Sequence, residues 1–85
     1  MKYLDVIDIL VDENPDALLA DGFEAALIGV AHSFNNTVAL YDLNKCINIL
    51  VKRDKMVEED AIEYLNYNVL TAYVGQHAPI FAYLL

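Results

Sequence analysis

The sequence has few of the residues that build metal and disulfide sites. Its 85 residues include one cysteine, Cys46, and two histidines. A single thiol excludes an internal disulfide and a zinc site made of several cysteines. His32 and His77 lie far apart, and neither has a carboxylate at the helical spacing of a ligand pair. We therefore expect no metal and no other cofactor.

Long apolar runs are also missing. The longest spans residues 25–31, whereas a membrane-spanning helix needs about 18 apolar residues or more. The chain does not open on a basic segment followed by an apolar one, which is the pattern of a secretory signal. We expect a cytoplasmic protein with no membrane partner.

Basic residues are scarce, because five Lys and Arg stand against 13 Asp and Glu, and the net charge is −8. Such a surface repels phosphate backbones, which disfavours direct nucleic-acid binding and favours a basic protein partner. The acidic excess is concentrated in residues 1–24, where seven carboxylates accompany Lys2 alone. The alternative is that these carboxylates only keep a helix face solvated. The candidate partner-binding residues are Asp5, Asp8, Asp12, Glu13 and Asp16.

Apolar side chains, in contrast, are abundant. Hydrophobic residues make up 58% of the chain and include six Tyr and three Phe, and disordered segments are poor in such residues. The length is that of one domain, so we expect residues 1–85 to fold as a single unit.

The N-terminal part is predicted to be helical. In residues 2–13 apolar positions recur at helical spacing, with aspartates on the opposite side. Asn14-Pro15 ends this helix because the residue before a proline avoids the helical conformation, and a short second helix follows at 16–20. A third helix is expected at 23–34, in which Gly29 would permit a close helix crossing.

The rest of the chain alternates between strands and helices, after a turn expected at Asn35-Asn36. The expected elements are a strand at 38–41, a helix at 43–53 capped by Asp42, a helix at 58–74 ending at Gly75, and a strand at 80–84.

These elements predict an α+β fold with the order α-α-α-β-α-α-β. If the last two helices form an antiparallel hairpin, strands 38–41 and 80–84 pair antiparallel. A two-stranded ribbon is marginal alone, so three to four helices must pack on it. An acidic helical segment, 1–20, would then precede a strand-helix-helix-strand unit at 38–85.

From about residue 14 onward, short motifs in a particular order and spacing carry a family resemblance. They are ALLADGF at 17–23, ALIGVA at 26–31, VALYD, KCI and IL within 38–50, RD, M, E, A and E within 53–63, and NV, VG and PIF within 68–81. With these motifs the chain resembles a family of small, functionally uncharacterised proteins encoded by tailed bacteriophages and prophages. The relatives usually carry Gly where Lys55 stands and Thr or Ser where Val57 stands. The resemblance implies a phage-borne protein made in the bacterial cytoplasm, and it implies no particular activity.

Cys46, His32 and Asp42 are the residue types of a nucleophile, a base and an orienting group. Cys46 lies on the predicted apolar face of helix 43–53, where thiols commonly act as small hydrophobes. We expect a structural role for Cys46 and no enzymatic activity.

Charged residues near the start of the last helix allow two interpretations. Arg53 and Asp54 could join Glu59 and Glu63 in a network, and Glu59 and Glu63 share a helical face. Such a network would either stabilise the helix start or form part of a carboxylate-and-cation active site. We favour stabilisation of the helix start.

Asn68 interrupts the apolar stripe between Leu65 and Val69 and is flanked by Tyr64 and Tyr67. A buried Asn needs hydrogen-bond partners, so we expect Asn68 to hold nearby backbone. Tyr64, Tyr67 and Asn68 are also the candidate ligand pocket.

Three functions remain open. The first is a non-catalytic phage accessory protein that binds and modulates a host or phage protein. The second is an acidic inhibitor, or DNA mimic, of a host nucleic-acid-binding or defence protein. The third is a small-molecule-binding module. A homodimer through a ribbon edge or the C-terminal Phe81, Tyr83 and Leu85 is a further hypothesis.

Overall fold

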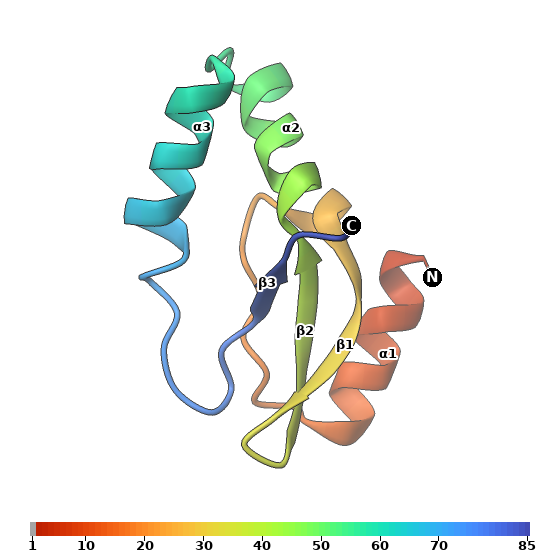
Figure 1. The fold of residues 1–85 in the computed structure, drawn as a ribbon. Helices are drawn as coiled ribbons and strands as arrows, with labels where there is room; N and C mark the ends of the chain where they lie inside the picture. Colours follow the sequence, from red (N-terminus) through yellow and green to blue (C-terminus); the bar gives the residue numbers. More distant parts are fainter. Residues whose placement is uncertain (1) are drawn as a thin grey trace.

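A computed structural model describes residues 2–85 and shows an α+β fold (Figure 1). A β-hairpin joins helices α1 and α2. Helices α2 and α3 form a helical hairpin, which leads to the last strand. The elements are α1 (Tyr3–Glu13), the 3-10 turn η1 (Glu24–Ala26), β1 (Leu27–Ser33), β2 (Asn36–Asp42), α2 (Leu43–Arg53), α3 (Glu58–Tyr64), the π-helical segment η2 (Leu65–Val69) and β3 (Ile80–Ala82).

The sheet has three strands in the order β1-β2-β3, so the expected two-stranded ribbon is wrong. Strands β1 and β2 are antiparallel, whereas β2 and β3 are parallel, with Leu40 opposite Ile80. In Figure 1, α2 continues away from the end of β2, and α3 returns beside it. Residues 70–79 then run back along the sheet (Figure 1), so that β3 runs in the same direction as β2 and pairs with its last residues, Leu40–Asp42. Residues 70–74 of this segment belong to the helix predicted at 58–74, and their non-helical course is what reverses the expected strand direction.

Strand β1 occupies the place of the expected helix at 23–34. That prediction is wrong, because only the 3-10 turn Glu24–Ala26 is helical in this stretch. A short apolar run fits a helix or a buried strand equally well by periodicity. Pairing with β2 decides between them by satisfying the backbone of β1. Gly29 lies in this strand beside a pairing irregularity, and a Cβ there would meet nothing within 4 Å, so the expected close crossing is wrong too.

Phe34 and Asn35 form the two-residue turn between β1 and β2. Their φ angles are 53° and 64°, as a hairpin turn with two left-handed residues requires. The turn therefore lies one residue earlier than the Asn35-Asn36 prediction.

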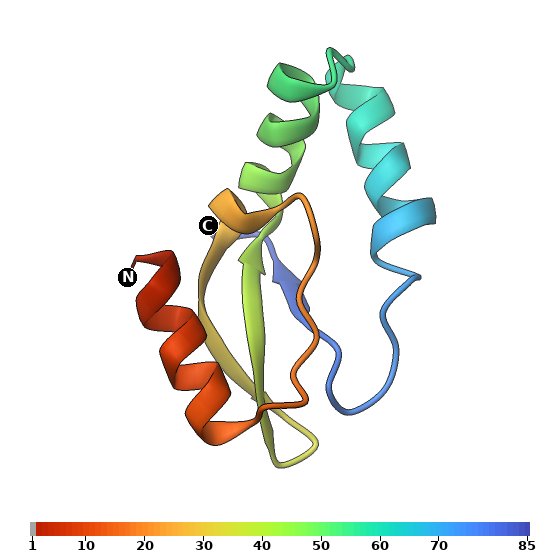
Figure 2. The same cartoon turned by 180° about the vertical axis from the view of Figure 1, so that it is seen from behind.

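The expected short helix at 16–20 is absent, and an extended segment takes its place. A residue distant in the chain holds the backbone of this segment, because Leu18 N–H donates to the His77 carbonyl at 3.0 Å. Figure 2 shows this segment crossing the sheet on the side where α1 packs.

The helices predicted at 2–13 and 43–53 are confirmed. Helix α1 begins at Tyr3 and buries Val6 and Leu10. Helix α2 spans Leu43–Arg53 as expected, and the Asp42 carboxylate accepts hydrogen bonds from the N–H groups of Asn44 (2.9 Å) and Lys45 (3.3 Å). These are the two helices with clear apolar stripes, and a cap reinforces the second.

The last helix is shorter than the expected 58–74. Helix α3 ends at Tyr64 and passes into the π-helical segment, closed by a 2.8 Å bond from Leu70 N–H to the Leu65 carbonyl. Gly75 has a φ of 97° but stands in a turn after the helix has ended, so it is no helix cap.

One hydrophobic core joins α1, the extended segment, the sheet and the helical hairpin. Tyr41 lies at its centre with 1% of its surface exposed, and its ring stacks on Phe81 with centroids 5.2 Å apart. Within residues 2–85, no helix combines the length and apolar character that crossing a membrane requires.

Candidate functional site

The outer face of α1 gathers Asp5, Asp8 and Asp12. Residues 5, 8 and 12 follow helical spacing opposite the buried Val6 and Leu10, and all three carboxylates are exposed. Two apolar side chains share this face, because Leu4 is 70% and Val11 62% exposed. We call Leu4, Asp5, Asp8, Val11 and Asp12 the α1 outer face.

Glu13 and Asp16 do not join this face. The Thr37 hydroxyl donates to Glu13 Oε1 at 3.2 Å, which directs Glu13 toward the sheet. Asp16 follows the helix, and its backbone N–H donates to Asn14 Oδ1 at 3.3 Å. Of the five acidic residues predicted from the sequence, three share a surface and two lie at its edge.

Asn14 connects three parts of the chain at the end of α1. It is buried, and its Nδ2 donates to the Thr37 carbonyl at 2.8 Å and to His77 Nδ1 at 3.1 Å. The Oδ1 accepts from Asp16 N–H, which leaves Nδ2 as the donor toward both partners. Because Nδ1 of His77 accepts this bond, the neutral ring carries its proton on Nε2.

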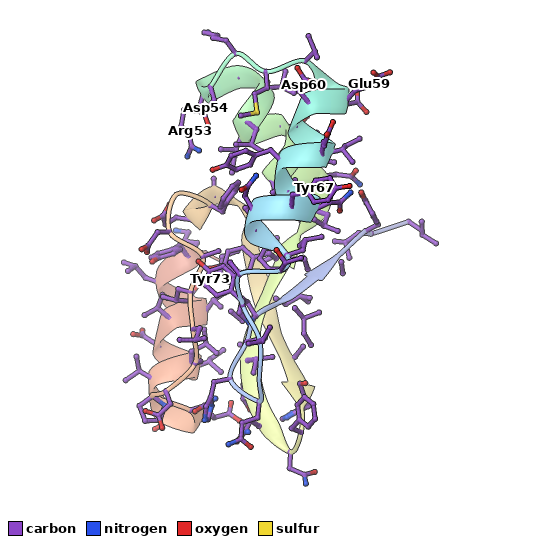
Figure 3. The ribbon with its side chains drawn as sticks, turned by 90° about the vertical axis from the view of Figure 1, so that its left-hand side faces the viewer. Arg53, Asp54, Glu59, Asp60, Tyr67 and Tyr73 are labelled. Carbon is purple, nitrogen blue, oxygen red and sulfur yellow. The ribbon has the colours of Figure 1, made fainter. Side chains whose placement is uncertain are left out.

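Tyr64, Tyr67 and Asn68 line one open groove of about 530 Å³ together with Met56, Asp60 and Glu63. We call this the tyrosine groove. Tyr64 is 40% exposed and Tyr67 73% exposed, and Figure 3 shows Tyr67 projecting from η2. Two aromatic rings beside two carboxylates offer a surface suited to a cation.

Asn68 is exposed, so the expectation of a buried Asn is wrong. The chain around it is π-helical, with hydrogen bonds that span five residues in place of four. The wider turn keeps Leu65 and Val69 in the core and leaves Asn68 on the outside.

Arg53 is held by its neighbours in the chain and in space. Its Nε lies 3.0 Å from Asp54 Oδ1, and its Nη1 donates to the Gly22 carbonyl at 2.6 Å. The guanidinium carbon lies 5.7 Å from the centre of the Phe23 ring. Hydrogen bonding to Arg53 holds the pKa of Asp54 below its usual range.

The expected network with Glu59 and Glu63 is not formed. Within residues 2–85 the ion pair of Arg53 is with Asp54, and Figure 3 shows Glu59 on the opposite side of the helical hairpin. The guanidinium therefore ties the end of α2 to the Gly22 turn, and it does not reach the start of α3.

A second groove, of about 370 Å³, was not predicted from the sequence. It is lined by Ala25, Lys45, Asn48, Ile49, Lys52 and Arg53, and we call it the lysine groove. Three of the chain's five basic residues meet here in a protein of net charge −8. The signal in the sequence is Lys45 and Lys52, seven residues apart on a predicted helix. Ala25 belongs to the 3-10 turn η1, which only the tertiary structure places beside α2.

Cys46 is fully buried in α2. Burial is the main cause that raises the pKa of its thiol to about 12, and the charge of Asp42 adds to it. The thiol is therefore protonated near neutral pH and packs as a small apolar group. His32 lies at the hairpin end of β1, opposite Thr37, whereas α2 extends from the other end of β2, so the two do not form a nucleophile-base pair.

Among residues 2–85, no three His, Cys, Asp or Glu side chains are grouped as metal ligands. Comparison of the chain with protein-family models, curated proteins and solved structures gave no match. The α1 outer face, the tyrosine groove and the lysine groove are the three candidate binding surfaces.

Proposed function

We propose that this chain is a non-catalytic protein-interaction module that binds a basic partner through the α1 outer face. The observation that carries the proposal is the mixture of side chains on this face. A helix face that is merely solvated carries polar residues, whereas here Leu4 and Val11 are largely exposed beside three aspartates. Apolar contacts surrounded by charge are characteristic of interfaces.

Charge indicates the nature of the partner. The three aspartates lie on a segment that holds most of the net negative charge, and such a field steers basic surfaces toward it. The resemblance to phage-encoded proteins supports a role as an accessory protein that modulates a host or phage protein in the bacterial cytoplasm.

Capture from bacterial lysate tests the proposal. The triple variant Asp5→Asn, Asp8→Asn, Asp12→Asn should lose a basic protein that the wild-type chain retains. Its matched control is Asp21→Asn, Glu58→Gln, Glu59→Gln, which neutralises three exposed carboxylates outside α1. Equal capture by the wild type and both variants would overturn the proposal.

Inhibition of a nucleic-acid-binding protein is a special case of the same interaction. The three carboxylates form one row, and at about 1.5 Å per residue Asp5 and Asp12 lie about 10 Å apart along the helix. Such a row can occupy a groove built for phosphates. This case requires that DNA or RNA compete with the chain for the captured partner, and that added salt weaken capture.

The tyrosine groove supports a second candidate function, the binding of a small organic cation. Two Tyr rings and the carboxylates of Asp60 and Glu63 line the same open volume, and rings with carboxylates recognise ammonium and guanidinium groups. Titration with tetramethylammonium and with arginine amide, followed by NMR, tests it. Shifts confined to the tyrosine groove and lost in Asp60→Asn, Glu63→Gln support this function, and unchanged spectra contradict it.

A further inference from the structure

The lysine groove has the features of a receptor for the α1 outer face. Its lining is basic through the exposed Lys45 and Lys52, and it also includes the half-buried Ile49 and the exposed methyl group of Ala25. The α1 outer face has the opposite charge and also carries apolar side chains. Within residues 2–85 the ion pair formed is that of Arg53 with Asp54, so the two lysines are free to pair with carboxylates.

The spacing of the charges also matches. Lys45 and Lys52 are separated by seven residues of helix, as are Asp5 and Asp12. Both pairs therefore span about 10.5 Å along their axes. Leu4 and Val11 have the same separation and lie beside the aspartates, where they can cover Ile49 and Ala25.

A chain cannot place its own α1 in its own lysine groove, because α1 packs on the sheet through Val6 and Leu10. We infer that the lysine groove of one copy receives the α1 outer face of a second copy, and that the exchange is reciprocal. Arg53, at the rim of the groove, lies on the same side of the molecule as α1 (Figure 3). Two copies that face each other on this side bring each α1 to the other's groove, which gives a closed two-fold dimer.

This inference rests on the proposed function, because it names a partner for the same α1 outer face. It also makes self-association and binding of a basic protein mutually exclusive. A basic partner that binds the α1 outer face more tightly would then dissociate the dimer.

Charge reversal on each side of the contact tests the inference. The variant Lys45→Glu, Lys52→Glu and the variant Asp5→Lys, Asp12→Lys are each expected to be monomeric where the wild-type chain is a dimer. We expect the dissociation constant to rise about tenfold or more for each. A mixture of the two variants restores both contacts, so heterodimers should form in sedimentation velocity.

Matched controls separate this contact from the effect of net charge. Lys55→Glu, Asn66→Glu, Gln76→Glu changes the charge equally outside both the groove and α1, and Asp21→Lys, Glu58→Lys does so outside α1. Both should dimerise as the wild type does at about 50 mM salt, and the wild-type dimer should weaken at about 500 mM.

Three results would overturn the inference, namely a wild-type monomer at millimolar concentration and low salt, a dimer insensitive to Lys45→Glu, Lys52→Glu, or no heterodimer in the mixture. None of them affects the proposed function, which fails separately when the α1 triple variant captures the same basic protein as the wild type.

Discussion

The backbone N–H of Ala20 donates a 2.9 Å hydrogen bond to the phenolic oxygen of Tyr41. Both residues are buried, and Tyr41 stands in the central strand. The bond therefore attaches the extended segment after α1 to the middle of the sheet. It also gives the Tyr41 hydroxyl a partner in a site that water does not reach.

Removing this hydroxyl should destabilise the fold. In Tyr41→Phe the Ala20 N–H is left buried without an acceptor, at a cost of about 1–3 kcal/mol. Urea unfolding should show the loss, and the Ala20 amide should exchange faster with deuterium. Tyr67→Phe is the matched control, because Tyr67 is 73% exposed, and it should change stability by less than about 0.5 kcal/mol. Equal effects of the two substitutions would contradict this role of Tyr41.

The φ angle of Lys55 is 61°, in the left-handed region that favours glycine. A non-glycine residue in this left-handed conformation costs about 1–2 kcal/mol, partly offset by the greater freedom of Gly in the unfolded chain. We expect Lys55→Gly to raise the free energy of unfolding by about 0.5–1 kcal/mol. Lys52→Gly, inside α2, should lower it by about 1 kcal/mol. A loss of stability in Lys55→Gly would refute the prediction.

Val57 is the N-cap residue of α3 and forms no side-chain cap. Its extended backbone, with φ −75° and ψ 157°, already suits a capping side chain. Val57→Ser should therefore stabilise the protein by about 1 kcal/mol in urea unfolding. Val57→Ala removes the same exposed side chain without adding a hydroxyl and should give no gain. If both variants behave alike, no cap is formed.

Two buried groups predict a loss of stability in alkali. Burial raises the pKa of Tyr41 to about 12 from an ordinary value of 10.0, and it raises the pKa of Cys46 to about 12 from 9.0. The unfolded chain loses these protons first, so the free energy of unfolding falls as pH rises above each ordinary value.

Between the unfolded and the folded pKa of each group, the free energy of unfolding falls by about 1.4 kcal/mol per pH unit. The fall caused by the Cys46 thiol begins first, at about pH 9. Urea unfolding at a series of pH values should show a shallower decline in Cys46→Ala than in the wild type. Parallel declines would show that the thiol is not involved.

Asn14 should determine the tautomer of His77. Its Nδ2 donates to His77 Nδ1, which predicts a proton on Nε2 of the neutral ring and a matching pattern of ¹⁵N shifts in NMR. Asn14→Ala removes this donor along with the bond to the Thr37 carbonyl. We expect a mixture of tautomers and a loss of about 1–3 kcal/mol in stability. An unchanged ¹⁵N pattern would show that the Asn14 contact does not select the tautomer.

The sequence by itself determined the features that depend on local spacing. Helices α1 and α2 follow from apolar residues that recur every three to four positions. The cap of α2 follows because Asp42 stands immediately before the first helical residue. The gathering of Asp5, Asp8 and Asp12 on one face follows from the same helical geometry.

The tertiary structure decided what depends on residues distant in the chain. The apolar run that begins β1 carries no periodicity that separates strand from helix, and only its pairing with β2 resolves it. The parallel direction of β3 depends on the course of residues 70–79, and a hydrogen bond from the distant Leu18 N–H to the His77 carbonyl holds this course. The lysine groove likewise needs Ala25 beside α2. Hydrogen bonds and packing between remote segments supply this information, and local side-chain preference does not contain it.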